Sequence, residues 1–359
     1  SRGLGDVYKR QVVIVQRTWY DDNIRKNDLY NWRQLMKVGI LGAGNIACKM
    51  AEAINGLDDS VEAYAIASRN LEKAEAFAVQ WGFQKAYGSY QALIEDPMVD
   101  LVYIATPHSH HFEPAKLCVE HGKAALVEKA FTMNAKQAKE LLTLAEEKNV
   151  LVTEAIWTRY MPSRKMIDDL VASGIIGNVT SLSANLGYAN GHLERMKRPE
   201  LAGGALLDLG VYPINFASMV FGTNVKEISS TCVKTETGVD SQDSITLIYE
   251  DGKAAYLYAT MLAQSNREGV IHGDKGFIEV QNINNCEEIR VYNLDYELTV
   301  RYEIPKQING YEYEVLACKK ALEQGAIECP QMPHRETIRI MELMDGLRTA
   351  WGIRFPGEA

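Results

Sequence analysis

The sequence predicts an α/β protein in which a doubly wound parallel sheet is followed by an α+β domain with a large open mixed or antiparallel sheet. Three observations support this. Apolar runs alternate with helical segments from residue 36 to about 154, a glycine-rich turn follows the first run, and one strand-like run follows another from about 224 to 302. The 359 residues suffice for two domains. We expect the first at 36–155 and the second at 156–359.

Strands and helices alternate in the first domain, which indicates parallel strands with helical crossovers and a ligand site beyond the carboxyl ends of the strands. The expected strands cover 36–41, 61–67, 99–104, 124–127 and 150–153, and the expected helices cover 45–56, 70–80, 111–121 and 134–148.

The pattern changes after about residue 154, where strands follow one another without helices between them. We expect helices near 162–173 and 203–221, strands at about 224–234, 242–250, 253–261, 268–273, 275–280, 288–292 and 296–302, and closing helices near 310–323 and 333–352.

Residues 1–35 show neither a helical nor an alternating pattern, whereas a clear strand pattern begins at Met36. Ser1–Gln11 resembles translated adaptor sequence. We therefore expect 1–35 to be a non-native or disordered extension; the alternative is a native N-terminal arm.

Composition narrows the class of protein. No apolar run approaches the 18 or so residues of a membrane span, so we expect no membrane partner. The net charge of −9 disfavours a nucleic-acid surface. Six cysteines without a C-x-x-C pair suggest neither a zinc site nor a disulfide framework, which fits reduced thiols in the cytoplasm.

A dinucleotide motif follows the first strand. A G-x-G-x-x-A pattern needs its first glycine for a tight turn, its second for close approach of a pyrophosphate, and a small last residue for helix–strand packing. Because the pattern also opens a helix, whose N-terminus favours an anion, we expect a Rossmann dinucleotide site rather than a structural turn. The motif consists of Gly42, Ala43, Gly44, Asn45, Ile46 and Ala47.

The end of the second strand indicates NADP. An NAD site would place a carboxylate there for the ribose hydroxyls, but the sequence has Ser68 and Arg69. Serine can hydrogen-bond a 2′-phosphate and arginine can pair with it. We expect NADP, with NAD possible; the alternative is that Arg69 is a solvated helix-start residue.

Thr106-Pro107-His108-Ser109-His110-His111 follows another strand and is expected to line the same cleft. Three histidines in four positions suggest a metal site. No Asp or Glu joins them at ligand spacing, so we expect no metal and assign Thr106, Pro107, His108 and His111 to the cofactor.

Glu128 and Lys129 end the strand 124–127, beside the expected nicotinamide position. Hydride transfer at an alcohol carbon needs a base for the hydroxyl proton, and the reverse reaction needs an acid; a lysine can supply either. The alternative is a lysine paired with a carboxylate for structure.

These motifs resemble the glucose–fructose oxidoreductase, inositol dehydrogenase and rhizopine-catabolism (Gfo/Idh/MocA) family over essentially all of 36–359. The segment 154–162 is similar to that of dimeric dihydrodiol dehydrogenases and D-xylose NADP dehydrogenases. The resemblance includes a Glu-Lys-Pro motif, with Ala130 in place of the proline. Because that proline helps to hold the strand end, either Lys129 is reached in a different geometry or some activity is lost.

The resemblance implies that Lys129 is the catalytic lysine, that Tyr212 donates a proton or binds a substrate hydroxyl, and that Asp208 orients the substrate. Independently, the four-residue spacing puts Asp208 and Tyr212 on one face of the helix expected near 203–221. We expect Trp157 to wall the pocket. Arg159 is equally compatible with the pocket and with a buried salt bridge.

The sequence therefore predicts an NADP-dependent oxidoreductase for a sugar, polyol or dihydrodiol, with Lys129 and Tyr212 in proton transfer. Two alternatives remain: an NAD-dependent glycosidase of the same fold, and a cofactor-binding regulator with weakened catalysis. The broad second sheet also predicts a homodimer or larger oligomer, with Tyr256 and Tyr258 either on the contact face or in the core.

Overall fold

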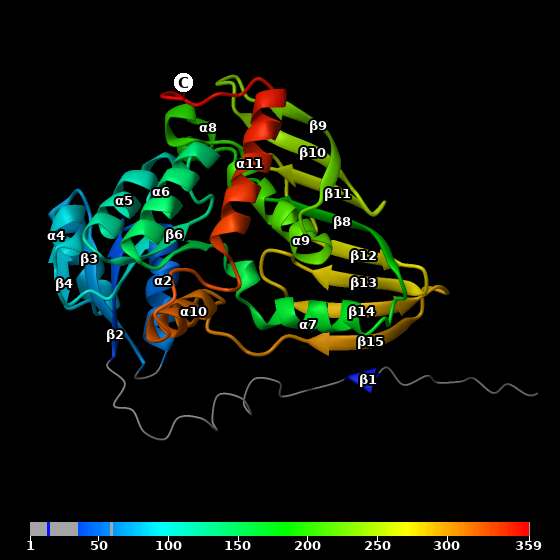
Figure 1. Cartoon of the computed structure of the whole chain (residues 1–359), viewed down its shortest axis with the longest axis horizontal. Coiled ribbons are helices and arrows are strands. Elements are labelled where there is room, and N and C mark those ends of the chain that lie inside the picture. Colours follow the sequence, from blue (N-terminus) through cyan, green and yellow to red (C-terminus); the bar gives the residue numbers. More distant parts are fainter. Residues whose placement is uncertain (1–12, 15–34, 58–59, 359) are drawn as a thin grey trace, which may run out of the picture.

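The computed structural model describes residues 13–14, 35–57 and 60–358, which form two β-sheets. Figure 1 shows the parallel sheet and its helices on one side of the molecule, a broad curved sheet on the other, and α11 between them. The predicted fold class is confirmed. The expectation about residues 1–35 concerns positions that, apart from 13–14 and 35, lie outside the described residues.

The N-terminal sheet has six strands in the order β4-β3-β2-β5-β6-β7, and all of its pairings are parallel. The order reverses between β2 and β5, so the loops that leave these two strands diverge and flank a crevice. The strands are β2 (Met36–Leu41), β3 (Val61–Ala67), β4 (Lys85–Tyr87), β5 (Leu101–Ile104), β6 (Ala124–Glu128) and β7 (Val152–Ala155).

Helices cover this sheet, and polar caps fix where several of them begin. The side chains of Asn70, Ser89 and Asn134 each accept a hydrogen bond from the backbone N–H three residues later. The helices are α2 (Asn45–Gly56), α3 (Leu71–Trp81), α4 (Tyr90–Ile94), α5 (Phe112–Glu120) and α6 (Ala135–Lys148). The short elements β4 and α4 were not predicted, because three to five residues are too few to show a periodicity.

The second sheet has nine strands in the order β1-β15-β14-β13-β12-β8-β11-β10-β9. It is mixed, because β8 pairs with β11 and β1 with β15 in parallel, while the other pairings are antiparallel. The strands are β1 (Val13–Ile14), β8 (Val179–Gly187), β9 (Val225–Lys234), β10 (Asp240–Tyr249), β11 (Ala254–Thr260), β12 (Gly269–Gly273), β13 (Gly276–Gln281), β14 (Glu288–Asn293) and β15 (Leu298–Glu303).

Strand β8 lies in the middle of this sheet but was not predicted. Its inward side chains Leu182, Ala184 and Leu186 are buried, but the residues between them are Ser and Asn, which have low strand propensity. The strand is therefore stabilised mainly by its two neighbours, β11 and β12.

The remaining helices are α7 (Pro162–Ala172), α8 (Glu194–Lys197), α9 (Val211–Phe221), α10 (Glu312–Glu323) and α11 (His334–Ala350). The last two return to the N-terminal layer, where α10 packs on α2 and α11 on α6. Asn309, just before α10, donates from Nδ2 to the Lys49 carbonyl at 2.9 Å. The chain end thus fixes the two sheets relative to each other.

The helix predicted over 203–221 consists of a π-helical turn, Leu206–Gly210, continued by α9. The turn begins where the backbone N–H of Leu206 donates to the Asp240 carboxylate. Gly204 has φ +123° and lies so close to Asp240 that a Cβ would overlap the carboxylate. Asp240 therefore caps this turn from a neighbouring strand and requires glycine at 204.

Among the described residues, the helical stretch Pro199–Phe221 is long and apolar enough to span a membrane by length and composition alone. No apolar run of this length was expected from the sequence. Of its most apolar window, 78% is buried inside the protein, as in a core helix that is apolar on all sides.

We expect Gly204→Ala to lower the free energy of unfolding by about 2 kcal/mol or more, because alanine adds both backbone strain and a clash with Asp240. Gly238→Ala is the control, since its φ is +88° but its Cβ would meet no atom within 4 Å. That change should cost about 1 kcal/mol from strain alone. Urea unfolding measures both values, and equal losses would contradict the role given to Asp240.

Candidate active site

The glycine-rich turn lies at the edge of the crevice between β2 and β5. Gly42 has φ +100°, and a Cβ there would lie 2.8 Å from the Ala105 carbonyl oxygen. Ala47 is fully buried against the sheet. Gly44 differs, because a Cβ there would meet no protein atom within 4 Å. The protein itself therefore does not require glycine at 44, but a group approaching from outside would.

The N-terminus of α2 is open to an anion. Gly44 occupies its N-cap position and has no side chain to accept from the first N–H groups, unlike the capped helices α3, α4 and α6. Ala43 and Ile46 are partly buried and pack against the core, while Asn45 is exposed. This cradle fits the pyrophosphate of a dinucleotide.

The end of β3 presents a hydroxyl and a guanidinium. Ser68 is buried and its Oγ accepts a 3.3 Å hydrogen bond from the Asn70 N–H. Arg69 is exposed, and its guanidinium makes no hydrogen bond or ion pair with any residue that the structure describes. Burial lowers the pKa of His110, and the charge of Arg69 lowers it further, which links Arg69 to the loop after β5.

The loop after β5 packs partly inside the protein. His111 is fully buried, and its ring nitrogens lie 2.7 Å from the Thr106 carbonyl and 2.9 Å from the Ala130 carbonyl. The His111 imidazole therefore joins two strand-end segments inside the protein, and its assignment to the cofactor stays a prediction. Thr106 uses its hydroxyl to bond the His110 carbonyl, and Pro107 is exposed.

His108 points from this loop toward Asp208. Its Nδ1 donates to the Ala202 carbonyl at 3.0 Å, and its Nε2 lies 3.9 Å from Asp208 Oδ1. Burial lowers the pKa of His108 to about 3, so the ring is neutral at ordinary pH. His108 thus lies against the carboxylate that is predicted to orient the substrate.

Lys129 is held by Asp208. Its Nζ donates to the Asp208 carbonyl at 2.8 Å and to Oδ1 at 3.0 Å. The Lys129–Ala130 peptide is cis, and Ala130 is fully buried. Burial raises the pKa of Glu128 to about 7 against the charge of Lys129, and Glu128 also accepts a hydrogen bond from the Tyr103 hydroxyl.

Asp208 and Tyr212, which their spacing placed on one helix face, both lie beside Lys129. The Lys129 ammonium lies 5.1 Å from the centre of the Tyr212 ring. Burial alone would raise the pKa of Asp208, but the charges of Lys129 and Arg195 bring it well below its usual range. Asp208 is therefore a permanent carboxylate between two cations.

Trp157 contacts Tyr311 and Tyr212. Tyr311 covers one face with a ring separation of 4.2 Å and an interplanar angle of 11°. The indole Nε1 donates to the Tyr212 hydroxyl at 3.1 Å and to Asn284 Oδ1 at 3.3 Å. The indole N–H is thus used in a hydrogen bond to the candidate proton donor, and the role of Trp157 as a pocket wall stays a prediction.

Arg159 takes the salt-bridge alternative. Its guanidinium donates to Asn215 Oδ1 at 2.6 Å and to Glu336 Oε1 at 2.8 Å, and the side chain is buried. Arg159 and Glu336 line a cavity of about 1580 Å³ between α7, α10 and α11, and Lys129 and Tyr212 do not line it.

Sequence reasoning missed Arg195, Tyr311 and Asn284, which contact Asp208 or Trp157. Arg195 donates from Nη2 to Asp208 Oδ2 at 3.1 Å. No motif marks these residues, because each is joined to the site by folding and not by spacing in the sequence. Among the described residues, no group of three or more His, Cys, Asp or Glu side chains could hold a metal ion.

Comparisons with known proteins agree with this architecture. A family model described as the GFO/IDH/MocA oxidoreductase family with an NAD-binding Rossmann fold matches residues 36–156, and a model of the GFO/IDH/MocA C-terminal domain matches 165–279. The trans-1,2-dihydrobenzene-1,2-diol dehydrogenase of Mus musculus is 32% identical over 333 residues, covering 89% of this chain and 98% of that protein. The human enzyme of the same name is 31% identical over 328 residues, with the same coverage.

Two solved structures share the fold. KijD10, a 3-ketoreductase from Actinomadura kijaniata in complex with NADP and TDP-benzene, has a TM-score of 0.80 at 24% identity and covers 88% of this chain and 98% of its own. Levoglucosan dehydrogenase in complex with NADH and levoglucosan has a TM-score of 0.80 at 19% identity and covers 89% and 97%.

Glu154, near the end of β7, is a buried acid whose titration can be tested through the pH dependence of the free energy of unfolding. Burial raises its pKa from 4.5 to about 7. The folded protein therefore binds this proton more tightly than the unfolded chain, so the free energy of unfolding falls as the pH rises through this window. We expect the free energy of unfolding of Glu154→Gln, taken relative to that of the parent, to rise by about 3 kcal/mol between pH 4.5 and pH 7.5.

Chemical denaturation at several pH values measures this gain. Glu147→Gln, at an exposed position on α6, is the control because it removes an acid without touching the buried cluster. A Glu154→Gln difference that does not change with pH would show that Glu154 does not titrate as described.

Proposed function

Because the chain belongs to the GFO/IDH/MocA family of oxidoreductases, we propose that it transfers a hydride between NADP and a hydroxyl or carbonyl carbon of a sugar, polyol or dihydrodiol. The observation that carries the proposal is the meeting of Lys129, Asp208 and Tyr212 beyond the carboxyl ends of the parallel strands. An ammonium, a carboxylate and a phenol at one point suit a substrate with neighbouring hydroxyl groups.

Lys129 is proposed as the proton-transfer residue. Bound nicotinamide supplies the hydride acceptor or donor. In the reducing direction the Lys129 ammonium gives its proton to the carbonyl oxygen, and in the oxidising direction the neutral amine takes the proton of the hydroxyl. The two hydrogen bonds from Lys129 Nζ to Asp208 support this role, because they hold the nitrogen in place in both directions of the reaction.

Tyr212 is proposed to bind the oxygen that Lys129 protonates, by donating a hydrogen bond to it from the phenol. Its hydroxyl oxygen accepts the Trp157 indole N–H, so its own O–H proton is left to donate outward. Asp208 is proposed to orient the substrate from between Lys129 and Arg195. The resulting roles for Trp157 and Tyr311 are to hold the phenol in place.

The cofactor is proposed to be NADP, with the phosphates on the N-terminus of α2 and the 2′-phosphate between Ser68 and Arg69. Three features support the fit: the open space beside Gly44, the missing side-chain cap of α2, and the Arg69 guanidinium without a partner among the described residues.

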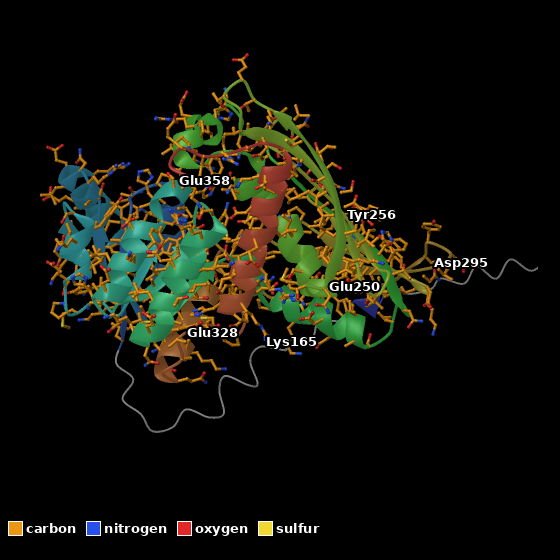
Figure 2. The ribbon with its side chains drawn as sticks, turned by 45° about the horizontal axis from the view of Figure 1, so that its top comes forward. Lys165, Glu250, Tyr256, Asp295, Glu328 and Glu358 are labelled. Carbon is orange, nitrogen blue, oxygen red and sulfur yellow. The ribbon has the colours of Figure 1, made fainter. Side chains whose placement is uncertain are left out.

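We also propose a homo-oligomer that uses the uncovered face of the nine-stranded sheet. Tyr256 and Tyr258 lie on that face and are 53% and 39% exposed, which excludes the core alternative for both. Figure 2 shows Tyr256 on the side of the sheet away from α11. Farther along the same face, Phe277 on β13 and Tyr292 on β14 stack with their ring centres 4.7 Å apart. Such an aromatic surface is typical of self-association.

We also propose a cytoplasmic location, which fits the six free cysteines.

The cofactor proposal predicts that Arg69→Ala raises the KM for NADPH about 10- to 100-fold, which is the effect of losing one charged hydrogen bond to a phosphate. The KM for NADH should stay within about twofold, because NADH lacks that phosphate. Steady-state kinetics with both cofactors measure the two effects on the same variant. Equal kcat/KM for NADPH and NADH in the parent would contradict the NADP assignment.

The reaction is tested by following NADPH absorbance, with NADH in parallel, across aldoses, inositols, deoxysugar ketones and dihydrodiols. We expect Lys129→Met to lower kcat on the best substrate by about 10²- to 10⁴-fold, the usual contribution of an acid–base group. Lys116→Met is the matched control, because Lys116 pairs with exposed Glu140 on the outside of the same layer.

Binding of NADPH to Lys129→Met, measured by its fluorescence, should match the parent and exclude a folding defect. A kcat of Lys129→Met within a few-fold of that of the parent would contradict the mechanism. Release of sugar from an aryl glycoside without net change in NADPH would establish the glycosidase, and tight NADPH binding without any consumption would establish the regulator.

A further inference from the structure

Asp208 lies between two cations from different parts of the chain. Its Oδ1 accepts from Lys129 at 3.0 Å and its Oδ2 from Arg195 at 3.1 Å. The Asp208 side chain is 8% exposed, whereas that of Arg195 is 47% exposed. A guanidinium on the surface therefore reaches inward to the carboxylate that holds the proposed catalytic lysine.

The segment that carries Arg195 is fixed at several points. The Lys197 carbonyl accepts from the Thr237 hydroxyl at 2.6 Å, and the Ala202 carbonyl accepts from His108 at 3.0 Å. Gly203 packs so closely that a Cβ there would lie 2.6 Å from the Arg195 carbonyl oxygen. The backbone near residue 195 is thus connected both to the loop after β5 and to the turn between β9 and β10.

We propose that Arg195 is a positioning residue for the reaction: it holds Asp208 by Oδ2 so that Oδ1 stays on Lys129, and it shares the charge of Asp208 so that Lys129 gives up its proton more readily. The kinetic part of this inference rests on the proposed function. Arg195 acts through Asp208 and is not itself required to touch the substrate.

The charge of Asp208 acts on Lys129 together with every other group that faces the pair. An arginine beside the carboxylate offsets part of its attraction for the lysine ammonium, and loss of the arginine would make the lysine hold its proton more tightly. The titratable and charged groups around the pair are Glu128 from β6, His108 and His111 from the loop after β5, Arg195 from α8, Tyr212 from α9 and Tyr311 beside α10.

The first test measures Lys129 directly and needs no substrate. Protein containing [6-¹³C]lysine is titrated by NMR, with the Lys129 signal assigned from its absence in Lys129→Arg. We expect Arg195→Met to move the Lys129 midpoint to higher pH by about half to one unit, and Arg195→Lys to return it toward the parent.

Arg198→Met is the matched control, because Arg198 lies on the same segment, is 53% exposed and pairs with exposed Glu200 at 3.5 Å. Arg198→Met should leave the Lys129 midpoint unchanged. The proposal would be overturned if Arg195→Met left the Lys129 midpoint at the parent value, or if Arg198→Met moved it as far as Arg195→Met does.

The second test is kinetic. Arg195→Met should lower kcat about tenfold and move the pH limb governed by Lys129 upward, while NADPH binding and the KM for NADPH stay within about twofold. Arg195→Lys should recover part of kcat. A loss confined to KM, or a kcat loss without movement of the pH profile, would mean that Arg195 serves the substrate or the fold instead.

The two tests fail separately. If no substrate in the panel is turned over, the proposed function fails, but the lysine titration still decides whether Arg195 acts on Lys129 through Asp208. If the parent is active and the titration does not move, the function stands and the role of Arg195 is rejected.

Discussion

The contact between Lys129 and Asp208 is the point on which the site depends. Lys129 ends a parallel strand of the N-terminal sheet, and Asp208 lies in the π-helical turn that packs on the second sheet. Their ion pair forms only when the two sheets take up their relative position, which α10 and α11 secure by packing back on α2 and α6. Through this contact, the geometry of the proposed chemistry is a direct consequence of how the two halves of the chain assemble.

The acids near this point show how burial and neighbouring charge compete. Asp208 has two cations on its oxygens, which outweigh burial and keep it ionised. Glu128 and Glu154 lie at neighbouring strand ends, and for both of them burial dominates and raises the pKa to about 7. The three carboxyl groups therefore differ in pKa because the balance of burial and neighbouring charge differs, and the carboxylate whose pKa is lowered lies beside the lysine.

Sequence patterns located the N-terminal elements closely, because both the apolar runs and the turn chemistry are local. β2, α2 and β3 begin and end where expected. The helices predicted at 70–80 and 134–148 begin one residue later in the structure than predicted. The reason is that Asn70 and Asn134 are N-cap residues that precede the helix. Strand β8 escaped prediction because its stability comes from β11 and β12 and not from its own composition. The same limit applied to the π-turn, whose start depends on Asp240 from another strand.

What the sequence by itself determined was the chemistry available at each strand end: the glycine turn, the serine and arginine after β3, and Lys129, Asp208 and Tyr212. Spacing along one chain segment was enough to place Asp208 and Tyr212 together. The tertiary structure alone decided which groups were free to act. It buried His111 between two carbonyls, turned the Trp157 indole toward Tyr212, gave Arg159 to a salt bridge and brought Arg195 onto Asp208. Hydrogen-bond partners far apart in sequence are set by packing, and no local pattern encodes them.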